Sequence, residues 1–255
     1  MMNPILSVND LSIQIKQRSL FEHVSFTIDS GEAVLLSGPN GIGKSSLLKS
    51  IMRLEPENKQ ITGSIVYSGF GNILTLGSAD IQRFRSCIAY IQQKDEYAEM
   101  GNVQVRDILS DSGEAFSGRS LSYSEVNDLI DEWIPRRSDN TRVFDAKSKP
   151  AKFSGGEQRL LSVLSVVATR PSAQLMIIDE PLNNLDFNNA RNISNVINKV
   201  LRDHPQASLL MISHCRIFPF ITREVKLTSG GIQEVPEHYV CHSCIGEHDE
   251  NGFYQ

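Results

Sequence analysis

The chain has 255 residues, which is enough for one large domain or two small ones with a substantial hydrophobic core. Its 25 basic and 30 acidic side chains give a formal net charge of −5, which argues against a protein that coats nucleic acid, and no nucleic-acid partner is expected. Four cysteines in a chain of this length argue against a disulfide framework.

The composition is that of a folded, soluble protein, with 40% hydrophobic and 22% charged residues. No apolar run approaches the roughly 18 residues that a helix needs to cross a bilayer. Residues 1–16 lack the basic segment and the long apolar run of a secretory signal. We therefore expect a cytoplasmic protein.

Short apolar runs alternate with longer helical patterns along the chain, which is typical of an α/β protein. Strands are expected at residues 5–8, 11–15, 24–28, 33–36, 65–67, 88–91, 175–178 and 209–212. Apolar residues at helical spacing predict helices from residue 44 to about 55, at 126–134, at 160–168 and around 193–201.

Residues 94–152 differ from the rest of the chain because they are polar and rich in Ser, Asp and Glu. Within this stretch, Ser122 and Glu125 form a possible capping box before an amphipathic helix. We interpret the stretch as a helical insertion into a core domain of residues 1–235. Residues 236–255 are interpreted as a separate polar tail that contains cysteines and histidines.

A glycine-rich segment lies between a predicted strand and a predicted helix, and it fits the pattern G-x-x-x-x-G-K-[ST]. Its glycines let backbone N–H groups converge on phosphate oxygens, and the helix that follows adds its positive end. The lysine can reach the β- and γ-phosphates, and the serine hydroxyl can hold Mg²⁺. A chance glycine-rich turn is the less favoured alternative, because the strand and the helix are both in place. The expected ATP-binding residues are Gly38, Pro39, Asn40, Gly41, Ile42, Gly43, Lys44, Ser45 and the adjacent Ser46.

Two acidic residues follow the predicted buried strand at 175–178. Asp179, at the tip of this strand, can hold Mg²⁺ together with Ser45. Glu180 comes next and can act as a general base on a water that attacks the γ-phosphate. A strand that ends in solvated acids is the alternative, and it is disfavoured by the presence of the phosphate loop.

Residues 153–158, FSGGEQ, look like the signature motif of ABC transporter ATPases, usually written LSGGQ, and this resemblance covers about residues 5–233. The motif also satisfies S-x-x-E, so an ordinary capped helix is the alternative when it is taken alone. The resemblance implies an α/β fold with a P-loop NTPase core of ABC ATPase type, an N-terminal antiparallel β subdomain and an inserted helical subdomain. It also implies that the signature meets ATP held by a second subunit, through Ser154, Gly155, Gly156 and Glu157.

Further residues resemble the family's other motifs in the same order. Gln93 looks like the glutamine that contacts Mg²⁺ and water, with Gln92 as the alternative register. Asp186 resembles the aspartate of the D-loop, and His214 the switch histidine that contacts the γ-phosphate and organises the general base. The family usually has an aromatic residue against the adenine, where this chain has Ile15, so the preference for ATP over GTP stays open.

The resemblance implies an ATP- and Mg²⁺-dependent hydrolase that works as a homodimer or with a paralogous ATPase subunit. It would dock through the helical subdomain on an integral membrane permease at the inner face of the cell membrane. Two alternatives remain. One is a soluble ABC ATPase without a transport role, for example in cluster assembly, and the other is a nucleotide-dependent scaffold with little turnover. The intact base Glu180 argues against the scaffold.

The tail contains one Cys-x-x-Cys pair with histidines nearby, which could bind Zn²⁺ in tetrahedral geometry. Structural zinc sites usually combine two ligand pairs, so a reduced, solvated tail is the favoured interpretation. The possible ligands are His238, Cys241, Cys244 and His248.

Overall fold

The computed structural model describes residues 4–54, 59–93, 97–170, 173–182, 185–214 and 218–236. Residues 237–255, which include the possible zinc ligands, lie outside these ranges. Contacts within the chain define two units. The core unit contains the described residues up to 89, those at 173–180 and those at 205–236, and the helical unit contains those at 90–170 and at 181–204.

A six-stranded sheet has the order β10-β9-β3-β8-β7-β6. The strands β9, β3, β8 and β7 are parallel, and β10 pairs antiparallel with β9. The predicted strands at 33–36, 175–178 and 209–212 are confirmed, and their continuous apolar runs are buried, as expected for a parallel sheet covered on both faces. The strands are β3 (Ala33–Ser37), β6 (Ile88–Ile91), β7 (Leu175–Asp179), β8 (Ser208–Ile212), β9 (Arg223–Thr228) and β10 (Gly231–Val235).

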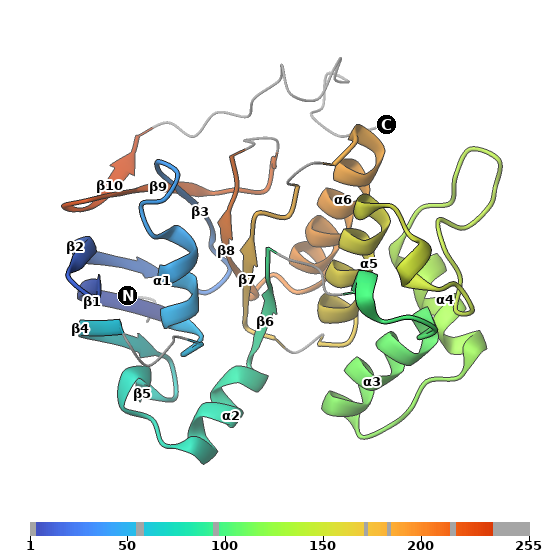
Figure 1. Cartoon of the computed structure of the whole chain (residues 1–255), viewed down its shortest axis with the longest axis horizontal. Helices are drawn as coiled ribbons and strands as arrows, with labels where there is room; N and C mark the ends of the chain where they lie inside the picture. The colour runs from blue at the N-terminus through green and yellow to red at the C-terminus, as the bar shows by residue number, and fades with distance from the viewer. Residues whose placement is uncertain are drawn as a thin grey trace. The chain divides into compact units, whose positions relative to one another are not determined.

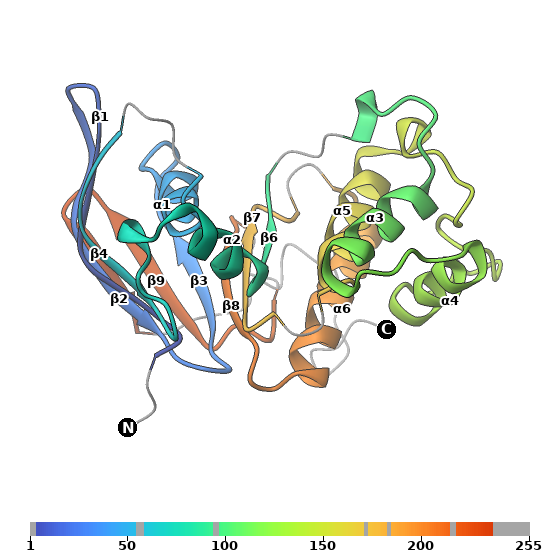
Figure 2. The ribbon, with the colours of Figure 1, turned by 90° about the horizontal axis from the view of Figure 1, so that it is seen from below.

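A second, antiparallel sheet in the core unit has the order β2-β1-β4-β5. The two runs predicted at 5–8 and 11–15 form one strand, because the chain continues through Asp10 in a left-handed conformation (φ 50°) as a bulge. Figures 1 and 2 show helix α1 between this sheet and the strands of the larger one. The strands are β1 (Leu6–Ile15), β2 (Arg18–Ile28), β4 (Lys59–Tyr67) and β5 (Gly71–Asn72).

The helix after the phosphate loop, α1 (Lys44–Ile51), is shorter than the sequence predicted. The apolar spacing continues to Leu54, but Leu54 is 40% exposed and lies beyond the end of the helix. Arg53 takes a left-handed conformation (φ 50°), and this ends the helix. The core unit also contains the helix α2 (Ser78–Ser86) and the short 3₁₀ helix η1 (Ile73–Thr75).

The helical unit extends beyond the 94–152 segment, because it also includes α5 and α6. The predicted capping box is confirmed, since the Ser122 hydroxyl accepts from the Glu125 N–H and the Glu125 carboxylate accepts from the Ser122 N–H. The helix α3 (Val105–Ser117) was not predicted, because polar residues interrupt its apolar face. The helices are α3 (Val105–Ser117), α4 (Tyr123–Trp133), α5 (Gly155–Val167) and α6 (Phe187–Asp203), with η2 (Tyr97–Glu99) and η3 (Pro150–Lys152). Within the described ranges, none of the helices combines the length and apolar character needed to span a membrane.

Candidate nucleotide-binding site

The predicted phosphate loop connects β3 to α1, and its glycines have backbone conformations that other residues rarely adopt. Gly38, Gly41 and Gly43 have φ values of 141°, 76° and 108°. A Cβ at Gly38 would lie 2.6 Å from the Leu227 carbonyl oxygen, and one at Gly43 would lie 3.1 Å from the Phe21 ring. A Cβ at Gly41 would have no neighbour within 4 Å. The loop is therefore packed at its two ends and open in the middle, where a phosphate can approach the backbone.

Lys44 is the first residue of α1, and its side chain folds back over the loop. Its ammonium donates to the carbonyl oxygens of Gly38 at 2.8 Å and Pro39 at 3.1 Å. Burial lowers the pKa of Lys44, and the nearby carboxylates of Glu180 and Asp179 act in the opposite direction. The Lys44 ammonium is therefore close enough to interact electrostatically with both predicted acidic residues, and all three residues belong to the core unit.

The N-terminus of α1 has no side-chain cap, because its N-cap residue is Gly43. The first N–H groups of a helix need acceptors from outside the helix, and a bound anion can supply them. Ser45 and Ser46 follow Lys44 in this first turn and are half-buried. The uncapped first turn of α1 can therefore bind the phosphates of a nucleotide through its backbone N–H groups.

Glu180 and His214, predicted to act together, are adjacent in the structure. Glu180 follows β7 and His214 follows β8, and these strands are parallel neighbours. The His214 Nε2 lies 3.0 Å from the Glu180 carboxylate, whose side chain is 14% exposed. The Glu180 N–H donates to the Ile212 carbonyl oxygen at 2.9 Å, which holds the residue at the edge of the sheet.

Asp179 is the last residue of β7 and is buried, with 2% exposure. A buried carboxylate next to a helix that begins with serine hydroxyls provides oxygen donors of the kind that Mg²⁺ takes. The core-unit residues therefore fit a magnesium nucleotide. Ile15 ends β1 and is half-exposed, and its predicted contact with adenine stays a prediction.

Gln93 follows β6 with an exposed side chain and belongs to the helical unit, so its contact with the residues of the core unit stays a prediction. The structure identifies a residue in this unit that the sequence analysis missed. Arg159 of α5 is buried, with 3% exposure, and donates to the backbone carbonyl oxygens of Gln92 and Pro181. The sequence offered one signal for this residue, because Arg159 directly precedes the apolar run 160–168, which was predicted to be a buried helix.

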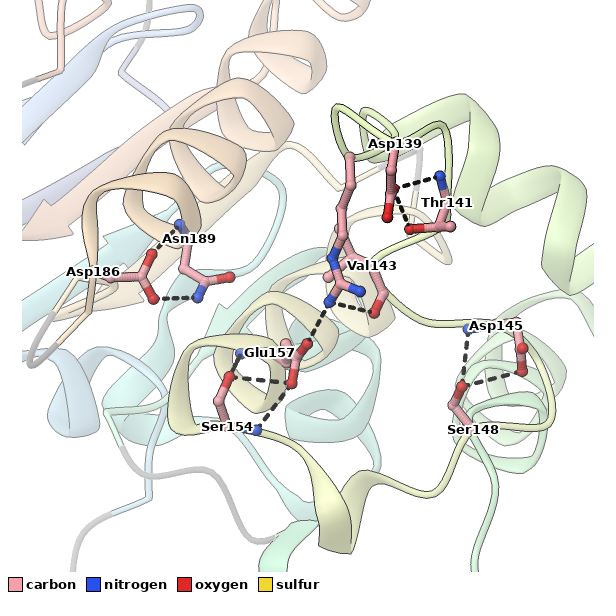
Figure 3. A network of polar contacts seen from close by, with 10 residues as sticks. Asp139, Thr141, Val143, Asp145, Ser148, Ser154, Glu157, Asp186 and Asn189 are labelled. Atoms are coloured by element: carbon pink, nitrogen blue, oxygen red, sulfur yellow. Dashed lines mark hydrogen bonds and ion pairs between the residues drawn. The ribbon is translucent and has the colours of Figure 1, made fainter.

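The predicted signature forms the start of α5, which is capped as its sequence predicts. The Glu157 N–H donates to the Ser154 hydroxyl at 3.2 Å, and the Ser154 N–H donates to the Glu157 carboxylate at 3.0 Å. Figure 3 shows these two side chains facing each other. The other carboxylate oxygen of Glu157 accepts from Arg137 at 2.9 Å. Arg137 is a second residue that the sequence analysis did not single out.

The start of α6 packs closely against the signature within the helical unit. Asp186 caps α6 by accepting from the Asn189 N–H at 2.9 Å and from its side-chain amide at 2.7 Å (Figure 3). This hydrogen bonding lowers the pKa of Asp186. A Cβ at Gly156 would lie 2.3 Å from the Asn189 amide nitrogen, so only glycine fits at this position without movement of Asn189. Residues 183 and 184 of the predicted D-loop lie outside the described residues.

Comparison with known proteins assigns the family. Residues 21–183 match the family described as ABC transporter. The chain belongs to this family. The putative ABC transporter ATP-binding protein BR1368/BS1330_I1363 of Brucella suis is 30% identical over 185 residues, which cover 72% of this chain and 71% of the relative. The phosphate import ATP-binding protein PstB 1 of Streptococcus pyogenes (serotype M1) is 28% identical over 220 residues, covering 81% and 80%.

One relative is much longer than the aligned region. The putative ATP-binding protein YdiF of Bacillus subtilis is 30% identical over 236 residues, which cover 91% of this chain and only 31% of YdiF. Among solved structures, an ATP-binding subunit of an ABC transporter is similar with a TM-score of 0.69 and 26% identity, covering 91% of this chain and 90% of that one. A nucleotide-free ATP-binding cassette, 17% identical with a TM-score of 0.68, supports the fold alone. The fold class is therefore confirmed, and the chain is an ATP-binding, ATP-hydrolysing component of the ABC transporter family.

The possible zinc site stays a prediction, because its four residues lie outside the described part of the chain. Within the described part, no group of three or more His, Cys, Asp or Glu side chains is arranged to hold a metal ion.

Proposed function

We propose that this chain hydrolyses ATP with Glu180 as the general base and uses the reaction to drive a separate membrane permease. The observation that carries this proposal is the contact between Glu180 and His214 at 3.0 Å, in the same unit as the phosphate loop. A carboxylate that is held at the edge of a parallel sheet by a histidine can accept a proton from water. This arrangement favours turnover over a nucleotide-binding scaffold.

The residues of the core unit divide the reaction between them. The open first turn of α1 would bind the phosphates, and Lys44 would leave the loop carbonyls and move onto the β- and γ-phosphates. An N–H at His214 Nε2 would donate to the Glu180 carboxylate and hold it in place, and the carboxylate would orient the attacking water. Asp179 and Ser45 would hold Mg²⁺, together with Gln93. When bound, this ion neutralises charge that develops on the phosphates.

The signature would act on the nucleotide of a second subunit, which is either another copy of this chain or a paralogue. Ser154, Gly155, Gly156 and Glu157 would face the γ-phosphate bound by the partner's loop, so that ATP joins the two subunits and its hydrolysis releases them. The segment 94–152 would contact the permease, and this would place the chain at the cytoplasmic face of the membrane. Ile15 would cover the adenine without aromatic stacking, which leaves the preference for ATP over GTP to be measured.

The variant Glu180→Gln tests the assigned base. It keeps the shape of the side chain and removes its basicity, so we expect ATP hydrolysis to fall by at least about 100-fold while ATP binding is retained. Phosphate release and the binding of a fluorescent ATP analogue measure the two properties separately. Unchanged hydrolysis in Glu180→Gln would show that another group is the base.

A further inference from the structure

The N-terminus of α5 carries a negative side chain where the proposed function requires an anion to bind. Glu157 lies in the first turn of α5, and its carboxylate accepts from the Ser154 N–H at 3.0 Å and from the Ser154 hydroxyl at 3.1 Å. A helix N-terminus carries roughly half a positive charge, whereas an ionised carboxylate carries a full negative one. On its own, the capped start of α5 would therefore have a net negative charge and would repel a phosphate.

Arg137 supplies the positive charge that reverses this sign. Its Nη2 lies 2.9 Å from the Glu157 Oε1 and also donates to the Val143 carbonyl oxygen at 3.2 Å. With this guanidinium included, the local charge changes from roughly −0.5 to roughly +0.5. The start of α5 then attracts an anion.

Arg137 does not belong to a helix, but its backbone is held in a tight turn. The Arg137 N–H donates to the Thr141 carbonyl oxygen, and the Asn140 N–H donates to the Arg137 carbonyl oxygen, both at 2.9 Å. Arg142, just beyond the turn, makes a two-pronged contact with Asp131 of α4 at 2.8 and 2.6 Å. The turn is therefore anchored to a helix, which limits the positions that the Arg137 side chain can take.

The ion pair lies in the wall of a cavity of about 620 Å³ within the helical unit. Two further arginines, Arg136 and Arg191, the carboxylate of Asp186 and four asparagines of α6 also line this cavity. Its three arginines outnumber its two carboxylates, so an anionic group that approaches the start of α5 meets a net positive charge and amide donors.

We infer that Arg137 is a positioning residue that neutralises Glu157, so that the start of α5 can bind the phosphate of a nucleotide held by the partner subunit. This inference rests on the proposed function. The competing explanation is an ordinary surface ion pair, because the Arg137 side chain is 49% exposed. Such a pair contributes little to stability and would have no effect on nucleotide binding.

The test measures ATP-dependent dimer formation by light scattering, with all variants made in the Glu180→Gln background. We expect Arg137→Ala to raise the ATP concentration for half-maximal dimer formation by roughly tenfold, the size of one partly screened charge interaction. Arg137→Gln, which keeps donors without the charge, should behave like Arg137→Ala. Arg137→Lys should stay close to the parent. Urea unfolding of each variant verifies that the fold is intact.

The chain offers a matched control at the start of α4. There Arg119 pairs with Glu125, which forms a capping box with Ser122, so the arrangement is the same as at α5 but lies outside the signature. Arg119→Ala should leave dimer formation unchanged. If Arg119→Ala and Arg137→Ala have equal effects, the inference is wrong.

A second comparison isolates Glu157 as the group through which Arg137 acts. In a Glu157→Gln background there is no negative charge to neutralise, so we expect the removal of Arg137 to shift the ATP requirement by less than about threefold. A full tenfold shift in that background, or no shift with Arg137→Ala alone, would overturn the inference and leave the proposed function intact. No ATP-dependent dimer in the Glu180→Gln parent would overturn both.

Discussion

At the scale of single residues, Glu180 combines an unusual backbone with a contact that suits catalysis. Its φ of 50° lies in the left-handed region, which few residues other than glycine adopt. Strain of this kind persists where the surrounding structure enforces it, and such positions cluster at functional sites. Here the Ile212 carbonyl oxygen binds the Glu180 N–H, and His214 contacts the carboxylate. These contacts hold Glu180 in this conformation directly after the end of β7.

Lys44 provides the prediction at this scale. Lys44→Ala should weaken ATP binding by roughly 10- to 100-fold, because a hydrogen bond to a charged group contributes about 1.5–3 kcal/mol. The matched control is Lys49→Ala, which removes an exposed lysine in the last turn of the same helix and should leave binding unchanged. Titration with a fluorescent ATP analogue measures both variants. Equal affinities would show that Lys44 does not contact the phosphates.

At the scale of elements, two helices of the helical unit begin with the same device. α4 and α5 each start with a capping box, in which a side chain at the N-cap and one in the first turn bind each other's backbone N–H. At α3, the Asp107 carboxylate accepts from the Gln104 N–H, and the Asp107 N–H donates to the backbone carbonyl oxygen of Gln104. α6 is capped by Asp186. In the core unit, α1 has no side-chain cap. The helix α2 also begins after a glycine without a side-chain cap, so the missing cap marks α1 as a phosphate site only together with the glycine-rich loop that precedes it.

The cap of α4 gives a prediction about stability. Ser122→Ala removes the hydroxyl that accepts from the Glu125 N–H and should lower the free energy of unfolding by about 1 kcal/mol. Ser120→Ala, two residues earlier, removes only an exposed hydrogen bond to Glu114 and should change it by less than about 0.5 kcal/mol. Urea unfolding followed by circular dichroism measures the difference. Equal effects of the two variants would contradict the role of the cap.

At the scale of the whole molecule, the predicted machinery is divided between the two units. The phosphate loop, Asp179, Glu180 and His214 belong to the core unit, whereas Gln93, the signature and Asp186 belong to the helical unit. In the proposed dimer, each nucleotide would therefore be bound by the core unit of one subunit and by the signature in the helical unit of the other.

The permease provides the prediction at this scale. The tagged chain, recovered from membranes solubilised in detergent, should co-purify with an integral membrane protein that spans the bilayer several times. Deletion of the permease gene should release the chain from the membrane fraction. Recovery of soluble partners alone, with the chain absent from membranes, would contradict the transport role and support the alternative of a soluble ABC ATPase.

The sequence alone determined the parts that depend on local order. The phosphate loop needs glycines, a lysine and a serine in one short segment, and the capping boxes at Ser122 and Ser154 need a glutamate three residues later. Buried parallel strands appear as continuous apolar runs, so β3, β7 and β8 were predictable. These features are visible because the interacting residues are neighbours in the chain.

Only the tertiary structure decided which distant residues meet. Glu180 and His214 are brought together by the pairing of β7 with β8. Arg137 and Glu157 lie 20 residues apart in the chain and belong to different elements. Arg159, an arginine buried beside an apolar run, follows no local pattern that reveals its backbone partners. The apolar spacing also predicts too long a helix α1, because the left-handed conformation of Arg53 ends the helix while the spacing continues. Pairings of this kind depend on how the elements pack, and packing is not encoded in the spacing of residues along any one element.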